Sequence, residues 1–245
     1  MPKIIKKKAV QKKPVQEEEI SGFALEVLNA LKKKQKMLIT VGIVVAAMLA
    51  LYLTFFMYSS SLKDEAAVIE KNANNYYYGE VTKLSISDEE RLQKALELYK
   101  ESVDIKVIPT ALFNLGNTYY RLGDYANAIK EYDLFVDEFS GNEELTALVY
   151  QKLAASYVRV GQNDKAFGVL GKLAKVKDGL FKDTALVLEA RYLENAGEAE
   201  KSLAKYRELM AEFPDSVWSA EAVSKLPTPK AADEKKVEEK AAEVQ

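Results

Sequence analysis

The pattern of apolar and polar positions divides the chain into one continuous apolar run and a long helical region after it. Residues 37–58 read MLITVGIVVAAMLALYLTFFMY and carry no charged side chain. As a helix this run would be about 33 Å long at ~1.5 Å per residue, and the hydrocarbon core of a membrane is about 30 Å thick. A surface helix of a soluble protein would need a polar face, which this run lacks. We therefore predict a transmembrane helix over residues 37–58.

Basic residues flank the apolar run unequally. Four lysines lie within residues 32–36, whereas Lys63 is the one lysine close behind the run. The positive-inside rule then predicts that residues 1–36 are cytoplasmic and that the body lies across the membrane. In a bacterial inner membrane, we therefore expect a single-pass protein with its body in the periplasm. A cleaved signal peptide is the alternative, but its apolar region would span only about 7–15 residues.

Small residues recur at every fourth position inside the apolar run, at Gly42, Ala46, Ala50 and Thr54. This spacing puts them on one stripe of a helix, where another transmembrane helix could approach closely. The stripe is therefore a candidate packing surface for a membrane partner. Small residues are common in membrane spans, so a chance arrangement is the alternative.

The two ends of the chain have different patterns. Residues 1–36 form a basic segment, in which Ile20, Phe23, Val27 and Leu31 follow helical spacing and predict a short amphipathic helix. This helix could lie at the inner membrane surface or dock onto a cytosolic partner. Residues 227–245 are charged and have no apolar face, which predicts a disordered, solvated tail.

An internal repeat organises residues 64–226. The first good copy contains Leu115, Gly116, Tyr119, Gly123, Tyr125, Ala128, Tyr132 and Phe135, and equivalents follow after 38 residues and again after a further 35 or 36. A degenerate copy with Ala95, Tyr99 and Ser102 precedes them by 33 residues. Each glycine permits the left-handed turn that ends a helix, and the small residue lets the next helix pack closely. The repeat predicts an all-α solenoid of helical hairpins that share one core.

These residues carry a resemblance to the tetratricopeptide repeat. Residues 109–142 contain the pattern LGxxYxxxGDYxxAIxxY, with Ser140 where the family has proline. Residues 147–178 and 182–215 match more weakly. The whole layout, a lysine-flanked span before an acidic repeat body, resembles the bacterial family of ancillary Sec-translocon subunits, whose repeat domain also occurs in a cell-division coordinator.

This resemblance implies a protein–protein interaction role. As an accessory subunit of the Sec translocon, the protein would pass secreted chains to periplasmic chaperones. Its partners would be translocon subunits, chaperones or unfolded secreted chains, together with the membrane. An envelope scaffold that organises cell-wall or cell-division machinery is the alternative.

In such arrays the first helix of each hairpin lines a concave groove. The candidate groove residues are Phe113, Asn117, Tyr120, Arg121, Leu148, Gln151, Ala155, Arg159, Asp183, Leu186 and Ala190. Phe113 stands where a carboxylate-clamping array would have lysine, so we reject a clamp and predict a mixed apolar groove for an extended or helical polypeptide. Ordinary packing contacts between helices are the alternative for part of this set.

Composition narrows the chemistry further. The chain has no cysteine and no histidine, which excludes disulfides, thiol nucleophiles, histidine bases and thiolate–imidazole zinc sites. Residues 63–245 carry 25 basic and 33 acidic side chains, and this acidic balance repels nucleic acid. We therefore interpret the tyrosine run at 76–78 as a cap of the array that also forms an interface with the membrane or a partner. We expect no enzyme activity, cofactor, metal or small-molecule substrate.

Overall fold

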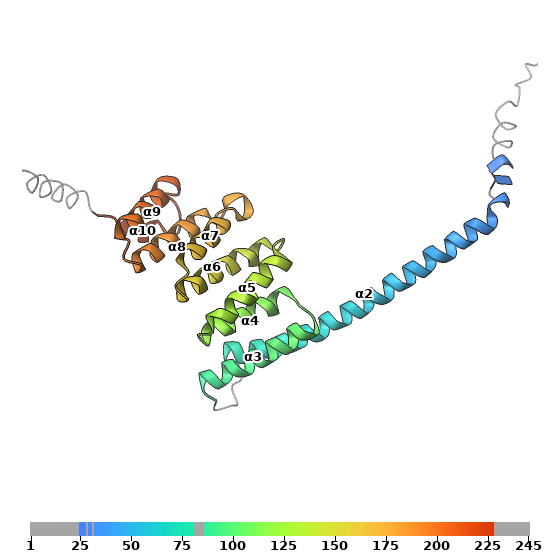
Figure 1. Ribbon diagram of the computed structural model, residues 1–245, viewed down its shortest axis with the longest axis horizontal. Coiled ribbons are helices and arrows are strands. Elements are labelled where there is room, and N and C mark those ends of the chain that lie inside the picture. The colour runs from blue at the N-terminus through green and yellow to red at the C-terminus, as the bar shows by residue number, and fades with distance from the viewer. Residues whose placement is uncertain (1–24, 28, 31, 81–85, 228–245) are drawn as a thin grey trace, which may run out of the picture. The chain divides into compact units, whose positions relative to one another are not determined.

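The computed structural model describes residues 25–27, 29, 30, 32–80 and 86–227. These residues are helical or in short turns and include no strand (Figure 1), which confirms the all-α prediction. The chain divides into two compact units, Met1–Ser60 and Ser61–Gln245. Most of the basic head with the start of its amphipathic helix, and nearly all of the charged tail, lie outside the described residues.

Helix α2, Gln35–Tyr78, contains the apolar run. By length and composition it is the one helix among the described residues that could cross a membrane, with a mean hydropathy of 2.4 in its most apolar window. Side chains 37–58 are all exposed. The hydroxyls of Thr40 and Thr54 donate to the carbonyls of Lys36 and Ala50, at 3.0 and 2.8 Å. Both polar groups are thus satisfied within the helix, as a hydrocarbon environment requires.

Helix α2 continues past the predicted span into the repeat unit. Residues 59–78 contain no glycine or proline, so nothing in the local sequence ends the helix before Gly79, which has a φ of 76°. The last turns of α2 therefore serve as the first helix of the degenerate hairpin.

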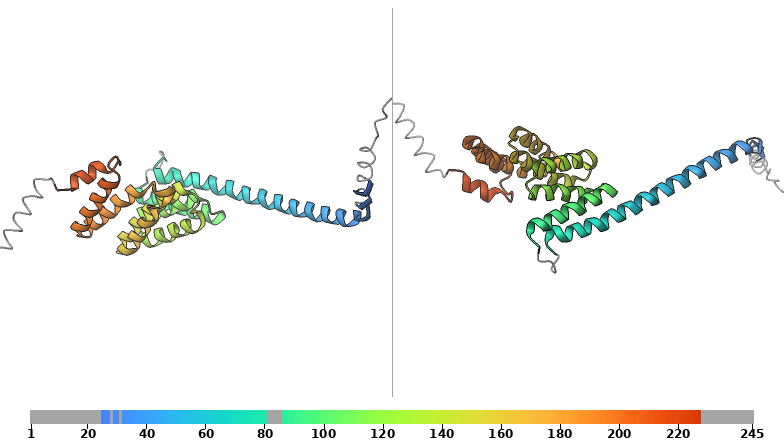
Figure 2. Two further views of the ribbon diagram at one scale, coloured as in Figure 1. Left: turned by 90° about the horizontal axis from the view of Figure 1, so that it is seen from above. Right: turned by 60° about the horizontal axis from the view of Figure 1, so that its bottom comes forward.

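The second unit is a series of antiparallel helical hairpins, stacked side by side in both Figure 1 and Figure 2. Its further helices are α3 Asp88–Ile105, α4 Pro109–Arg121, α5 Tyr125–Phe139, α6 Glu143–Arg159, α7 Asn163–Leu173, the 3-10 turn η1 Val176–Gly179, α8 Lys182–Asn195, α9 Ala199–Glu212 and α10 Ser219–Lys225. As expected, Pro109 begins α4, and α6 is 17 residues long against 13 in α4. The four extra residues of α6, about one helical turn, account for the longer 38-residue spacing between the first two good copies.

The predicted turns and packing positions are confirmed. Gly123, Gly161 and Gly197 have φ values of 79°, 75° and 80°, and the three small residues Ala128, Ala166 and Ser202 are buried. One core cluster runs from Ala73 in α2 to Ala185 in α8, with Tyr99, Tyr132, Phe135 and Leu170 fully buried within it. The hairpins from the end of α2 to the start of α8 therefore share a continuous core.

The degenerate first hairpin packs on the array. Ser102 donates to the carbonyl of Ala66 at 2.8 Å, which joins α3 to α2. Thr110 in α4 donates to the Glu70 carboxylate in α2 at 2.9 Å. The second half of α2 is thus bonded to both α3 and α4.

Helix α10 closes the other end of the array. Trp218, just before it, donates its indole N–H to the Thr184 hydroxyl at 3.3 Å. Arg191 donates to Glu221 at 2.8 Å. Behind these contacts lies a second core cluster made of Leu186, Val187, Ala190, Tyr206, Leu209 and Ala222.

Candidate interaction surface

Seven of the candidate groove residues remain accessible on the first helices of two neighbouring hairpins. Phe113, Tyr120 and Arg121 lie on α4, and Leu148, Gln151, Ala155 and Arg159 lie on α6. Arg121 and Arg159 are exposed, Leu148 is 46% exposed, and the other four are half-buried. We call the exposed side of α4 and α6 formed by these seven residues the first-helix face.

Asn117 is a correction to the predicted groove. Its side chain is only 8% exposed, and its Oδ1 accepts a hydrogen bond from the Tyr132 hydroxyl at 2.8 Å. The same pairing occurs in the first hairpin, where Asn74 accepts from Tyr99 at 2.5 Å. The amide therefore satisfies a buried phenol instead of meeting a ligand.

Leu186 and Ala190 are also corrections. Leu186 is 4% exposed and Ala190 is fully buried, because Trp218 and α10 cover this part of α8. Asp183 lies beside them, half-buried, and accepts a hydrogen bond from the Ser216 hydroxyl at 2.6 Å. The third copy therefore contributes a cap and no accessible apolar surface at these positions.

Tyrosine rings and cations alternate along the end of the first-helix face. The Arg121 guanidinium lies 4.9 Å from the ring centre of Tyr77, and it donates to the Tyr77 carbonyl at 3.1 Å. The Lys152 ammonium lies 5.6 Å from the ring centre of Tyr120. These distances are within the range of cation–π attraction.

The alternation continues through Tyr125 at the start of α5. Its ring packs edge-on against Tyr120, with the ring centres 5.1 Å apart. The Arg159 guanidinium lies 5.9 Å from the Tyr125 ring centre. We call Tyr77, Tyr120, Tyr125, Arg121, Lys152 and Arg159 the tyrosine–cation cluster. The sequence analysis named Tyr125 only as a repeat position and did not single out Lys152.

Hydrogen bonds and burial set the charge of this cluster. A hydrogen bond to Tyr120 raises the pKa of Arg159, and burial raises the pKa of Tyr77. Burial is also the main reason that the pKa of Tyr192 on α8 rises to about 12, with a smaller contribution from Tyr120. These shifts keep the phenols of Tyr77 and Tyr192 neutral and the Arg159 guanidinium charged at physiological pH.

None of the ion pairs among the described residues involves Arg121, Lys152 or Arg159. Some cations elsewhere on the array do have carboxylate partners: Lys177 pairs with Glu144 at 3.1 Å, and Lys182 pairs with Glu212. The tyrosine–cation cluster thus holds three positive charges that the protein itself does not neutralise.

The tyrosine run at 76–78 contributes mainly to packing. Tyr76 and Tyr77 pack against the main core, and the Tyr77 ring lies edge-on to Tyr99 with ring centres 6.2 Å apart. Arg91 donates to the carbonyls of Tyr76 and Tyr77. These hydrogen bonds satisfy carbonyls that have no partner within the last turn of α2. Tyr78 stays exposed.

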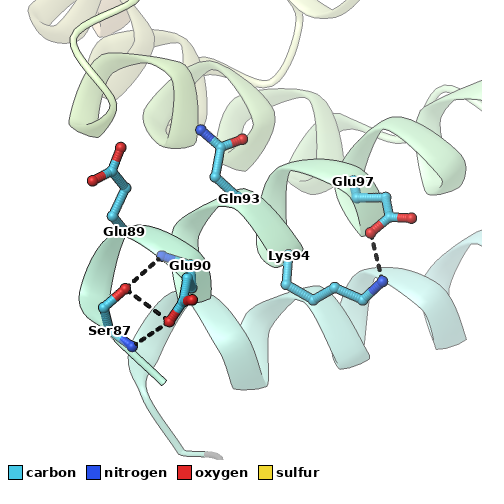
Figure 3. A pocket seen from close by; sticks show the side chains of 6 residues that line it. All are labelled: Ser87, Glu89, Glu90, Gln93, Lys94 and Glu97. Carbon is cyan, nitrogen blue, oxygen red and sulfur yellow. Dashed lines mark hydrogen bonds and ion pairs between the residues drawn. The ribbon is translucent and has the colours of Figure 1, made fainter. Parts of the chain in front are cut away.

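The hollow on α3 does not offer a binding site. It has a volume of about 770 Å³ and is lined by Ser87, Glu89, Glu90, Gln93, Lys94 and Glu97 (Figure 3). Ser87 and Glu90 form a capping box, with the Ser87 amide donating to Glu90 at 2.8 Å, and Lys94 pairs with Glu97. These polar groups stabilise one helix. Within the part of the chain that the structure describes, no acidic cluster could hold a metal ion.

Comparison with known proteins identifies one repeat and the fold. Residues 109–140 match the tetratricopeptide repeat family. The chain is similar to a kinesin light chain-like protein from Podospora anserina with nearly identical TPR-like repeats, with a TM-score of 0.50, 14% identity and coverage of 74% of this chain and 92% of that one.

Structures of MamA are also similar. MamA from Desulfovibrio magneticus RS-1 has a TM-score of 0.48 and 17% identity, over 64% of this chain and 80% of that one. Another MamA crystal structure has a TM-score of 0.44 and 21% identity, over 65% and 98%. No curated protein matches the sequence at a comparable level. The chain therefore contains a tetratricopeptide repeat within an all-helical solenoid of tetratricopeptide-like hairpins, a fold that mediates protein–protein interaction.

Proposed function

We propose that the protein is a membrane-anchored adaptor whose first-helix face binds a polypeptide. The observation that carries this proposal is the accessibility of Phe113, Tyr120 and Leu148 on two packed first helices, next to cations without carboxylate partners. Aromatic and aliphatic side chains supply contact area for a peptide, and unpaired charges add selectivity.

We further propose that this adaptor is an accessory subunit of the Sec translocon in a bacterial inner membrane. Three features support the proposal: the lysines before the apolar run, the exposed apolar helix α2 and the resemblance of the layout to that family. A span that holds a peptide-binding face near the channel exit would raise the effective concentration of emerging chains to about the millimolar range. The repeat unit would then pass secreted chains to periplasmic chaperones.

Site-specific photo-crosslinking in native membranes tests this function. A benzophenone amino acid replaces Leu148 on α6 in one sample and Leu134 on α5 in a control, since the two leucines are exposed to similar extents, 46% and 38%. We expect secreted chains or periplasmic folding factors to crosslink at position 148 and not at position 134.

Co-purification from mildly solubilised membranes distinguishes the proposed role from the scaffold. Recovery of Sec channel subunits with the full-length protein is the expected result. Recovery of cell-wall or cell-division proteins without any Sec component would replace the translocon role by an envelope scaffold. Equal crosslinking at positions 148 and 134 would remove the first-helix face from either role.

A further inference from the structure

We infer that the tyrosine–cation cluster selects acidic, extended polypeptide segments, whose carboxylates bind Arg121, Lys152 and Arg159. This inference deepens the proposed function and rests on it, because it names the chemistry of the polypeptide that the first-helix face accepts.

The first step is the local excess of positive charge. Lys152 and Arg159 both contact Tyr120, whose chain neighbour is Arg121. None of the three cations has a carboxylate partner, in a region of the chain where acidic residues outnumber basic ones by 33 to 25. Neighbouring like charges repel one another, which disfavours leaving them unneutralised. An anionic ligand removes this repulsion when it binds.

The second step is the way the cations are held. Each lies over a tyrosine ring at 4.9 to 5.9 Å from the ring centre, and the Tyr77 carbonyl also holds Arg121. Stacking restricts the long side chains before a ligand arrives, so less conformational entropy is lost on binding. The guanidinium groups also offer the planar geometry that carboxylates match.

The third step is the spacing of the cations. Arg121 and Arg159 stand 38 residues apart, at equivalent positions on α4 and α6, and these two helices pack directly against each other. Axes of packed helices are about 8–10 Å apart, which an extended chain crosses in about three residues at ~3.3 Å per residue. A segment with acidic residues about three positions apart can therefore reach both arginines at once.

The surrounding side chains favour a peptide over a nucleic acid. Leu148, which is 46% exposed, stands four residues before Lys152 on α6 and leaves apolar surface on the same side of the helix, where an apolar residue of a peptide can pack. A nucleic acid would offer bases and sugars but no aliphatic side chains for this apolar surface.

Fluorescence anisotropy with the full-length protein in detergent micelles tests the inference. The probe is a labelled, extended peptide with glutamate at every third position among glycine and leucine, and two matched peptides carry glutamine or lysine at those positions. We expect the glutamate peptide to bind, its affinity to fall as salt rises, and the lysine peptide not to bind.

Two variants locate the binding. The triple variant Arg121→Gln, Lys152→Gln, Arg159→Gln should weaken binding of the glutamate peptide by about 10–100-fold. The control Lys130→Gln, Lys172→Gln, Arg207→Gln removes the same charge from exposed positions on α5, α7 and α9, and should change the affinity by less than about threefold. If the triple variant misfolds by circular dichroism, the single variant at the exposed Arg159 replaces it.

The outcomes separate this inference from the proposed function. Equal binding of the glutamate and glutamine peptides, unchanged in the triple variant, would overturn acidic selection and leave the first-helix face as a peptide site. Displacement of the peptide by single-stranded DNA at equal concentration would also overturn it. Failure of every peptide to bind, together with failed crosslinking at position 148, would refute the proposed function itself.

Discussion

At the residue scale, Gly116 shows how one absent side chain permits close packing. A Cβ atom at this position would lie 2.6 Å from Cε1 of Tyr132, the ring that packs α5 onto α4. We predict that Gly116→Ala lowers the free energy of unfolding by about 1–3 kcal/mol through overpacking. Urea unfolding of the detergent-solubilised protein, followed by circular dichroism, measures the change.

Gly168 in α7 is the matched control for this prediction. A Cβ atom there would have no neighbour within 4 Å, so Gly168→Ala should raise the free energy of unfolding by about 0.5–1 kcal/mol through its helix preference. A stabilising effect of both substitutions would contradict the close contact between α4 and Tyr132.

Glu70 predicts a pH dependence of stability. Burial raises the pKa of its carboxyl above the ordinary value of 4.5, and the Thr110 hydrogen bond opposes that rise. The folded state therefore binds the Glu70 proton more tightly than the unfolded state does. The contribution of Glu70 to the free energy of unfolding must then fall as pH rises from about 4.5 through its raised folded-state pKa.

The substitution Glu70→Gln should reduce this fall, because glutamine cannot ionise and can still accept from Thr110. Unfolding curves at about pH 4.5 and about pH 7.5 give the comparison. Burial also raises the pKa of Glu131 and Asp133. Their contributions to the free energy of unfolding should therefore still fall with rising pH in the variant. The control Glu101→Gln, at an exposed position on α3, should leave the wild-type pH dependence in place.

At the element scale, α10 is too short to be stable by itself. It has seven residues, and isolated helices below about 12 residues are marginal in water. Contacts of Trp218 and Glu221 hold it against α8. We predict that Trp218→Ala lowers the free energy of unfolding by about 1–3 kcal/mol and speeds amide hydrogen exchange in α8 and α9 more than in α4.

Val217→Ala provides the control for α10. Val217 precedes the tryptophan and is 84% exposed, so its truncation should change stability by less than about 0.5 kcal/mol. Uniform acceleration of exchange along the whole array, or an equal effect of the two variants, would contradict a local capping role.

At the scale of the whole molecule, the placement of the lysines predicts the topology. The chain has no cysteine, so a single introduced cysteine reports its own side of the membrane. In spheroplasts, Lys172→Cys in the repeat unit should react with a membrane-impermeant maleimide, and Ser21→Cys should react only after lysis. The reverse pattern would place the repeats in the cytoplasm.

The sequence by itself determined the repeat, the turns and the apolar helix. The positions of Gly123 and Ala128, the start of α4 at Pro109 and the longer α6 all follow from local periodicity and backbone preference. These features depend on residues that are neighbours along the chain. The continuation of α2 to Tyr78 follows the same rule, since residues 59–78 contain no glycine or proline.

Only the tertiary structure decided which residues of the first helices stay accessible. Asn117 faces Tyr132, and α10 covers Leu186 and Ala190, although all three share helical positions with accessible residues. The pairing of Arg121 with Tyr77 joins residues 44 positions apart. Such contacts depend on how one hairpin lies on the next, because burial and neutralisation of charge are properties of the packed array and not of any one segment.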